Sequence, residues 1–162
     1  MKIIARVISG GQTGADIGAL RAARKCGLAT GGTAPKGFMT ELGPRPRLLK
    51  GFGLAEHVLP DYPARTSANV EAADVTLVLA RRLDRGSALT VRLCRRLGRP
   101  VRLLRGDGTE IADAMAWLRA ARQAHGKPLI VNLAGNRESR EPGIEARAEK
   151  FLTELFRLNR RG

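Results

Sequence analysis

Short apolar runs alternate with helix-like patterns along almost the whole chain. A typical run is Val75-Thr76-Leu77-Val78-Leu79-Ala80, which is nearly continuous in apolar residues, as expected of a strand covered on both faces of a sheet. The intervening segments repeat apolar residues at helical spacing, which predicts amphipathic helices. Repeated strand–helix units favour an α/β fold with a mostly parallel sheet and helices on both of its faces. The 162 residues fit one domain, which would span residues 1–162.

The same pattern sets approximate bounds for the elements. Strands are predicted at Ile3–Ile8, Leu28–Ala34, Glu56–Leu59, Val75–Ala80, Val101–Leu104 and Pro128–Leu133. Helices are predicted at Asp16–Lys25, Tyr62–Glu71, Ala88–Leu97, Ile111–Ala124 and Ile144–Leu158. The connection over residues 35–53 is rich in proline and glycine, and a loop of this length inside a compact domain is usually functional or disordered.

The most informative motif follows the first predicted strand and reads Ser9-Gly10-Gly11-Gln12-Thr13-Gly14-Ala15-Asp16. A strand that enters a glycine-rich turn and then a helix builds an anion site, because the backbone can approach a ligand closely and the helix start offers unpaired N–H groups. Gln12 and Thr13 add side-chain donors. The spacing matches neither the dinucleotide fingerprint nor the P-loop, and such a turn can also simply connect a strand to a helix. We interpret it as a cradle for a phosphate or similar oxyanion.

Two further polar turns follow predicted strands, at Asp84–Thr90 and at Gly135–Ser139. Ligands of open α/β sheets sit beyond the carboxyl ends of the strands, so we expect the three turns to converge there. Gly86, Ser87 and Thr90 are the candidate ligand-binding residues of the second turn. Ser87 is equally well explained as a helix N-cap.

Candidate ligand contacts also occur between these turns. Thr66 and Asn69 are three residues apart and share a helix face that could hydrogen-bond a ring or ribose, although a solvated face is an alternative interpretation. Lys36 lies two residues before Phe38, a pair that suits a ring with a phosphate tail, and an ordinary turn with a packed Phe explains it as well.

Composition changes this picture in one respect, which is charge. The formal net charge is +14 and most of the cations are arginines scattered over helices and loops, a surface that attracts polyanions. Several of the arginines could instead reflect a GC-rich genome, and we favour generic surface charge over nucleic-acid binding. No apolar run approaches the roughly 20 residues needed to span a bilayer, and the chain enters a strand without a signal-type segment, so we expect a cytoplasmic protein.

Few residues suggest catalysis. His57 and His125 have no nearby nucleophile or metal-ligand spacing, and Cys26 and Cys94 lie among apolar residues without a C-x-x-C motif. No nucleophile elbow is present in the sequence. Binding is therefore better supported than turnover, and we predict neither catalytic residues nor a metal site formed by the protein.

The order and spacing of four motifs resemble the molybdenum cofactor carrier family. These motifs are Ser9–Asp16, Pro35-Lys36-Gly37, Arg65-Thr66 with Asn69-Val70, and Gly86-Ser87-Ala88-Leu89-Thr90. The resemblance extends to the turn at Gly135–Ser139 and covers nearly the whole chain. It implies a Rossmann-like fold, assembly into a homo-oligomer (a dimer or tetramer), and binding of a phosphorylated pterin dithiolene that carries molybdenum. The ligand-binding residues that we predict from the motifs together are Gly10, Gly11, Gln12, Thr13, Gly14, Asp16, Lys36, Thr66, Asn69, Gly86, Ser87 and Thr90.

Two alternative functions follow from relatives of this family. The wider Rossmann-like group binds nucleotides and includes phosphoribohydrolases that act on nucleoside monophosphates, but their Pro-Gly-Gly-x-Gly-Thr signature is replaced here by Arg85-Gly86-Ser87-Ala88-Leu89-Thr90. The first turn also resembles DNA-processing proteins that act on single strands, for which the positive charge would be useful. Aromatic residues make up only 4% of the chain, whereas single-strand binders usually stack bases on aromatic rings.

Overall fold

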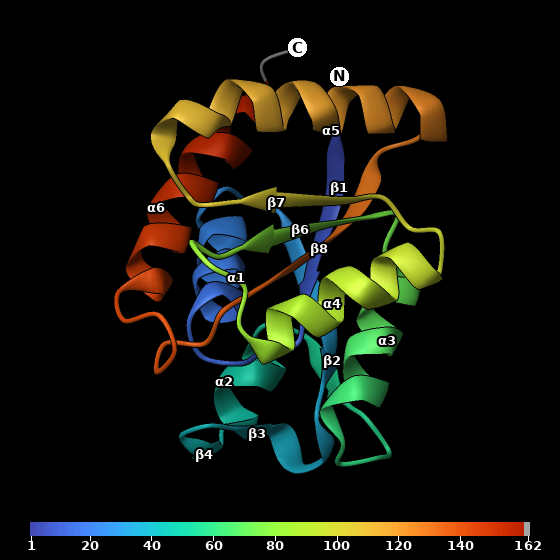
Figure 1. The fold of residues 1–162 in the computed structure, drawn as a ribbon. Coiled ribbons are helices and arrows are strands. Elements are labelled where there is room, and N and C mark those ends of the chain that lie inside the picture. Colours follow the sequence, from blue (N-terminus) through green and yellow to red (C-terminus); the bar gives the residue numbers. More distant parts are fainter. Residues whose placement is uncertain (161–162) are drawn as a thin grey trace.

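A six-stranded parallel sheet forms the centre of the molecule in a computed structural model that describes residues 1–160 (Figure 1). The strand order is β5-β2-β1-β8-β6-β7, and every neighbouring pair in this sheet is parallel. A separate short ladder joins β3 and β4 in antiparallel fashion. The predicted α/β class with a mostly parallel sheet is therefore confirmed.

The elements have the following bounds. The strands are β1 (Ile4–Ser9), β2 (Ala29–Ala34), β3 (Met39–Thr40), β4 (Gly43–Pro44), β5 (Leu54–Glu56), β6 (Val75–Leu79), β7 (Val101–Leu104) and β8 (Leu129–Gly135). The helices are α1 (Ala15–Lys25), α2 (Pro46–Gly51), α3 (Tyr62–Ala72), α4 (Arg85–Arg96), α5 (Ile111–His125) and α6 (Ile144–Arg157). Three 3₁₀ turns complete the set: η1 (Lys36–Phe38), η2 (Gly108–Glu110) and η3 (Leu158–Arg160).

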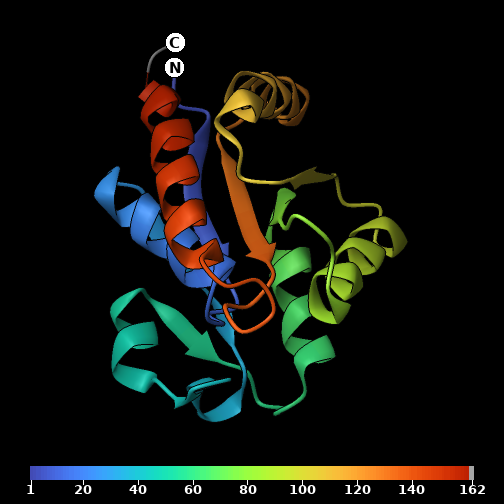
Figure 2. The ribbon, with the colours of Figure 1, turned by 60° about the vertical axis from the view of Figure 1, so that its left-hand side comes forward.

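Helices cover both faces of the sheet, as Figure 2 shows, with α1 and α6 on one side of β8 and α3 and α4 on the other. The main apolar core lies between the sheet and the face formed by α1, α5 and α6. It includes alanines of α1, such as Ala19, and fully buried strand residues such as Val7, Leu77 and Leu133. A second, smaller apolar cluster lies under α2 and is formed by Ile17, Leu20, Ala34, Phe38, Leu49, Phe52 and Leu54. The buried strands account for the nearly continuous apolar runs in the sequence.

The three central strands bring the polar turns to one edge of the sheet. Ser9 at the end of β1 pairs with Leu133 of β8, and Leu79 at the end of β6 pairs with Gly135 of the same strand. Because all three strands run parallel, their carboxyl ends lie side by side. The turns that follow β1, β6 and β8 therefore converge, as the sequence predicts.

The segment between β2 and α3 differs from its prediction. Instead of one long loop over residues 35–53, it contains η1, the β3–β4 ladder and α2, which begins at Pro46 and buries Leu49. The short strand lies at Leu54–Glu56 rather than at Glu56–Leu59, because its pairing with β2 matches Gly32 to Leu54. Proline is favoured at the first position of a helix, and Pro46 begins α2. A Pro-rich composition therefore does not by itself indicate a loop.

Candidate functional site

A small polar pocket lies where the three turns meet, on the α3 and α4 side of the sheet. Its volume is about 80 Å³. The lining residues come from the β1–α1 turn, from α3, from the start of α4 and from the end of β8. They are Gln12, Asp16, Tyr62, Arg65, Thr66, Asp84, Gly86, Leu89, Thr90, Ala134, Gly135 and Arg137.

The β1–α1 turn contributes the amide of Gln12 and the carboxylate of Asp16. The backbone N–H of Gln12 donates to Asp16 Oδ2 over 3.0 Å, and Asp16 lies in the first turn of α1, whose N-cap residue Gly14 provides no side-chain cap. A carboxylate in this position interacts favourably with the helix dipole. The start of α1 thus already holds an internal anion at the edge of the pocket.

Helix α3 places Arg65 over the turn and beside that carboxylate. Its side chain is only 12% exposed, and its Nη1 lies 3.9 Å from Asp16 Oδ2. A Cβ at Gly10 would lie 1.6 Å from this Nη1, so glycine is needed there for the guanidinium to fit. The guanidinium carbon also lies 5.4 Å from the centroid of the Tyr62 ring, within cation–π range.

Burial shifts the protonation of this pair. It raises the pKa of Asp16 to about 6, and the neighbouring Arg65 and the backbone N–H of Gln12 oppose part of that rise. Burial also lowers the pKa of Arg65, while the charge of Asp16 opposes the shift. Asp16 is therefore protonated more readily than an ordinary exposed aspartate.

Two buried donors at this pocket have no hydrogen-bond partner among the described residues: Gln12 Nε2 and Arg65 Nε. Buried polar atoms are normally paired, so such atoms require an explanation. Both groups are N–H donors, and both belong to side chains that line the pocket. A ligand that satisfies them has to present acceptor atoms.

The N-terminus of α4 is capped by side chains of its N-cap residue and first turn. Asp84 is the N-cap residue, with Oδ1 accepting from the Ser87 N–H over 2.8 Å, and the Ser87 hydroxyl accepts in turn from the Asp84 N–H. The Ser87 hydroxyl also donates to Asn136 Oδ1 over 2.7 Å in a buried contact between α4 and the turn after β8. The helix start therefore lies three residues earlier than predicted, and Asp84, rather than Ser87, is its N-cap.

A second network of hydrogen bonds joins the β3–β4 turn to the β1–α1 turn and to the turn after β8. Glu41 Oε1 accepts from the Thr13 hydroxyl, and Glu41 Oε2 accepts from the Ser139 hydroxyl over 2.5 Å. Gln12 Oε1 accepts from the Glu41 N–H over 2.9 Å, and Thr13 Oγ1 accepts from the Glu138 N–H over 3.2 Å. Burial acts to raise the pKa of Glu41, but the hydrogen bonds from Ser139 and Thr13 outweigh it and lower the pKa below its ordinary value.

The predicted ligand-binding residues separate into two groups. Those that line the pocket are Gln12, Asp16, Thr66, Gly86 and Thr90. The others lie outside its lining: Gly10, Gly11, Thr13, Gly14, Lys36, Asn69 and Ser87.

Several of the second group have evident structural roles. Gly14 has a φ of 80°, and a Cβ there would lie 2.5 Å from the carbonyl oxygen of Asn136, so glycine permits the first and third turns to pack closely. Asn69 donates to the Thr33 carbonyl and accepts from the Thr33 N–H over 2.9 and 2.8 Å, which joins α3 to β2. Lys36 is exposed on η1, after the end of β2.

Sequence reasoning did not assign Tyr62, Arg65, Asp84 or Arg137 to the site. Arg65 and Tyr62 share the helix face of Thr66 and Asn69, so the i, i+3 and i+4 spacing on α3 was a usable signal. Arg137 lies within the predicted third turn. Its guanidinium carbon is 5.8 Å from the centroid of the Tyr62 ring, and its Nε is 4.0 Å from Glu41 Oε2. No spacing rule connects it to a ring so distant in sequence.

Neither a metal cage nor a membrane helix is evident in residues 1–160. In this range, no three side chains of His, Cys, Asp or Glu are grouped so that they could hold a metal ion. None of the helices over the same residues has the length and apolar character that crossing a membrane requires.

The chain matches the Circularly permutated YpsA SLOG family over residues 7–156. It is similar to the crystal structure of a proposed molybdenum carrier protein from Syntrophus aciditrophicus SB, with 35% sequence identity, a TM-score of 0.82 and 96% of each chain covered. No curated protein matches the sequence.

Proposed function

This chain belongs to the Circularly permutated YpsA SLOG family, and from that premise we propose that it binds and carries a small phosphorylated ligand at the strand ends. The ligand that we infer is of the pterin type, namely the molybdenum cofactor. The observation that carries the proposal is the pair of unpartnered donors, Gln12 Nε2 and Arg65 Nε, at one pocket. The similar structure named as a proposed molybdenum carrier supports the choice of ligand.

The chemistry of the donors favours an oxyanion. A phosphate group presents several acceptor oxygens, and guanidinium groups pair with them in planar, charge-assisted hydrogen bonds. Arg65 and Arg137 both line the pocket and supply such groups. In this proposal the hydroxyls of Thr66 and Thr90 complete the binding site.

The size of the pocket suggests which part of the ligand enters it. A volume of about 80 Å³ is below the roughly 300–1,000 Å³ of pockets that enclose a drug-sized ligand. We infer that the phosphate end occupies the pocket and that the ring system lies across its mouth, beside Tyr62 and Leu89. In this proposal Gly10, Gly14, Thr13, Asn69 and Ser87 do not contact the ligand but hold the residues that line the pocket in position.

Molybdenum is cargo in this proposal. The pterin dithiolene holds the metal, which requires no metal ligands from the protein. The protein contributes binding and protection without a chemical step, and we expect it to act as a homo-oligomer. A nucleotide would present the same phosphate chemistry to the pocket and is the alternative ligand.

Two matched variants test the site. Arg137 lines the pocket, whereas Arg140 is exposed and its side chain has no hydrogen-bond or ion-pair partner within the described residues. Arg137→Ala and Arg140→Ala remove the same charge three positions apart. With molybdopterin released from a molybdoenzyme as the probe, Arg137→Ala should raise the Kd about tenfold or more, since a charge-assisted hydrogen bond contributes roughly 1.5–3 kcal/mol. Arg140→Ala should leave the Kd unchanged.

The readout is a fluorescence titration together with native mass spectrometry, which reports the ligand mass and the number of subunits. Equal affinities of both folded variants would contradict the site. A bound mass that corresponds to a nucleotide would replace the pterin with the alternative ligand while keeping the site.

A further inference from the structure

A second hollow lies on the opposite side of the sheet from the candidate pocket, beside α6. Its volume is about 570 Å³, within the range of small-molecule sites. The end of β6, the turn after β7 and one face of α6 enclose it. The lining residues are Arg81, Arg105, Gly106, Asp107, Gly108, Arg147, Lys150, Phe151 and Glu154.

Positive side chains dominate this hollow. Four cations line it, against the two carboxylates of Asp107 and Glu154. Asp107 Oδ1 is already used, since it accepts from the Thr109 N–H over 3.2 Å. Within residues 1–159, the side chains of Arg81, Arg105 and Lys150 make no ion pair.

Arg147 is fixed in place by its neighbours. Its Nε donates to the Arg105 carbonyl over 3.1 Å, and its Nη2 pairs with Glu141 Oε2. The backbone of Gly106 lies directly beneath it: a Cβ there would lie 3.3 Å from Arg147 Nε, at a φ of 80° that also favours glycine. The guanidinium is therefore held against the turn before any ligand arrives, which lowers the entropic cost of binding.

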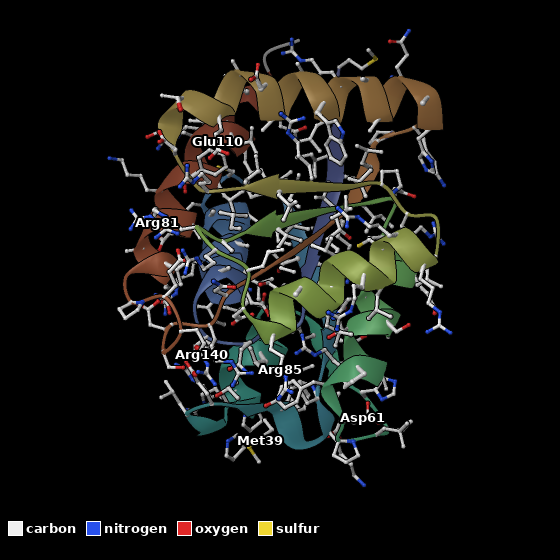
Figure 3. The ribbon with its side chains drawn as sticks, viewed as in Figure 1. Met39, Asp61, Arg81, Arg85, Glu110 and Arg140 are labelled. Carbon is white, nitrogen blue, oxygen red and sulfur yellow. The ribbon has the colours of Figure 1, made fainter. Side chains whose placement is uncertain are left out.

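The turn itself is also held rigid. The Glu110 carboxylate accepts from the N–H groups of Arg105 and Asp107, at 2.9 Å in each case. Figure 3 shows Glu110 and Arg81 on the same side of the molecule, next to α6. The cations thus extend from a braced turn and a helix rather than from a loose surface segment.

We propose that this hollow binds a linear polyphosphate group, such as the triphosphate of a nucleotide or inorganic tripolyphosphate. Three unpaired cations around a fixed guanidinium match several adjacent phosphate charges better than a single one, because each guanidinium can pair with two oxygens. The hollow offers no exposed aromatic ring, since Phe151 is only 3% exposed. The phosphate chain, rather than a base, is what this site recognises.

The probe is tripolyphosphate, with orthophosphate for comparison. Calorimetry gives the affinity, and amide NMR shifts of Gly106 and Gly108 locate the site, against Gly86 and Gly135 as reporters of the other pocket. We expect tripolyphosphate to shift the first two amides and to bind more tightly than orthophosphate. The triple variant Arg81→Ala, Arg105→Ala, Lys150→Ala should raise its Kd by at least about tenfold, a conservative loss for three charge-assisted hydrogen bonds.

A charge-matched variant separates this site from the general positive charge. Arg92, Arg95 and Arg96 on α4 are exposed and have no ion-pair partner within residues 1–159. Their triple alanine variant removes the same charge from the other face and should leave tripolyphosphate affinity close to that of the unaltered protein. Equal weakening by both triple variants, or shifts confined to Gly86 and Gly135, would overturn the proposal.

Discussion

The two ends of the Gln12 side-chain amide have different partners. Its Oε1 accepts from the N–H groups of Thr13 and Glu41, at 3.0 and 2.9 Å, whereas its Nε2 is buried and has no partner within the described residues. One residue therefore holds the turn in shape and presents a donor to the pocket. Sequence motifs identify Gln12 as a candidate, but the division between its atoms depends on the position of Glu41.

Asp16 should make anion binding depend on pH. Burial raises its pKa to about 6, so the carboxyl is neutral below that pH and negatively charged above it. A negative charge beside Arg65 weakens attraction to a bound anion. The affinity for an anion should therefore be highest below pH 6 and fall, on the order of tenfold, as the pH rises through 6.

Sulfate is the suitable probe, because its own charge stays constant between pH 5 and 7.5. Calorimetric titrations over that range should show the decrease in the unaltered protein and a flat profile in Asp16→Asn. The variant His57→Gln/His125→Gln should keep the decrease, because neither histidine lines the pocket. An unchanged slope in Asp16→Asn would assign the pH dependence to another group.

At the scale of the element, the start of α4 shows how a helix N-terminus can be used internally. Ser87 and Asp84 satisfy each other's N–H groups in a capping box, and Ser87 also donates to Asn136. Such an arrangement leaves the hydroxyl little freedom to bind a ligand. The sequence correctly places a polar turn here but does not show which residue begins the helix, because Asp84 and Ser87 are both good N-caps.

Ser87→Ala tests which role predominates. If the hydroxyl is structural, the variant should lose about 0.5–1.5 kcal/mol of unfolding free energy, because the Ser87–Asn136 hydrogen bond is lost while Asn136 Oδ1 still accepts from the Asp84 N–H. Ligand affinity should stay unchanged. Thr90→Val is the matched control: its hydroxyl lines the pocket and makes only a 3.3 Å bond to the Gly86 carbonyl. It should weaken binding more than stability. Urea denaturation and titration of each variant distinguish the two results, and loss of affinity in a stable Ser87→Ala would restore Ser87 to the ligand site.

Elements with strong periodicity were the easiest to predict. Strand β6 and helix α6 lie close to their expected bounds, because each is covered by the main core along its buried side. The elements over residues 35–53 were not predicted, because α2 is a single short helix whose Leu49 packs into the second apolar cluster. Short elements stabilised by tertiary packing give little local signal.

For the whole molecule, charge and aromatic content bear on nucleic-acid binding. The formal net charge of +14 favours association with polyanions in general. The four phenylalanines are buried, at 2–6% exposed, Trp117 packs against the main core, and the single tyrosine, Tyr62, is half-buried at the candidate pocket. Base stacking, the usual basis of tight single-strand binding, therefore has little aromatic surface available.

Oligonucleotide binding should accordingly be general and electrostatic. Affinity for a single-stranded oligonucleotide should fall steeply with salt, because it depends on released counterions. The two triple alanine variants, on α4 and around the basic hollow, should weaken it to a similar extent, unlike their effects on tripolyphosphate. Fluorescence anisotropy at several salt concentrations provides the measurement. Salt-resistant binding would instead indicate a dedicated nucleic-acid site.

Local pattern in the chain was sufficient for the parallel α/β architecture and for the meeting of three polar turns, because both follow from periodicity and from the direction of parallel strands. The electrostatics of the pocket required the folded molecule. Arg65 reaches Asp16 and lies over Gly10 only because α3 packs beside β2 and β8, and the donors without partners are recognisable only once their surroundings are known. Burial and pairing arise between residues far apart in sequence, and no local rule encodes such distances.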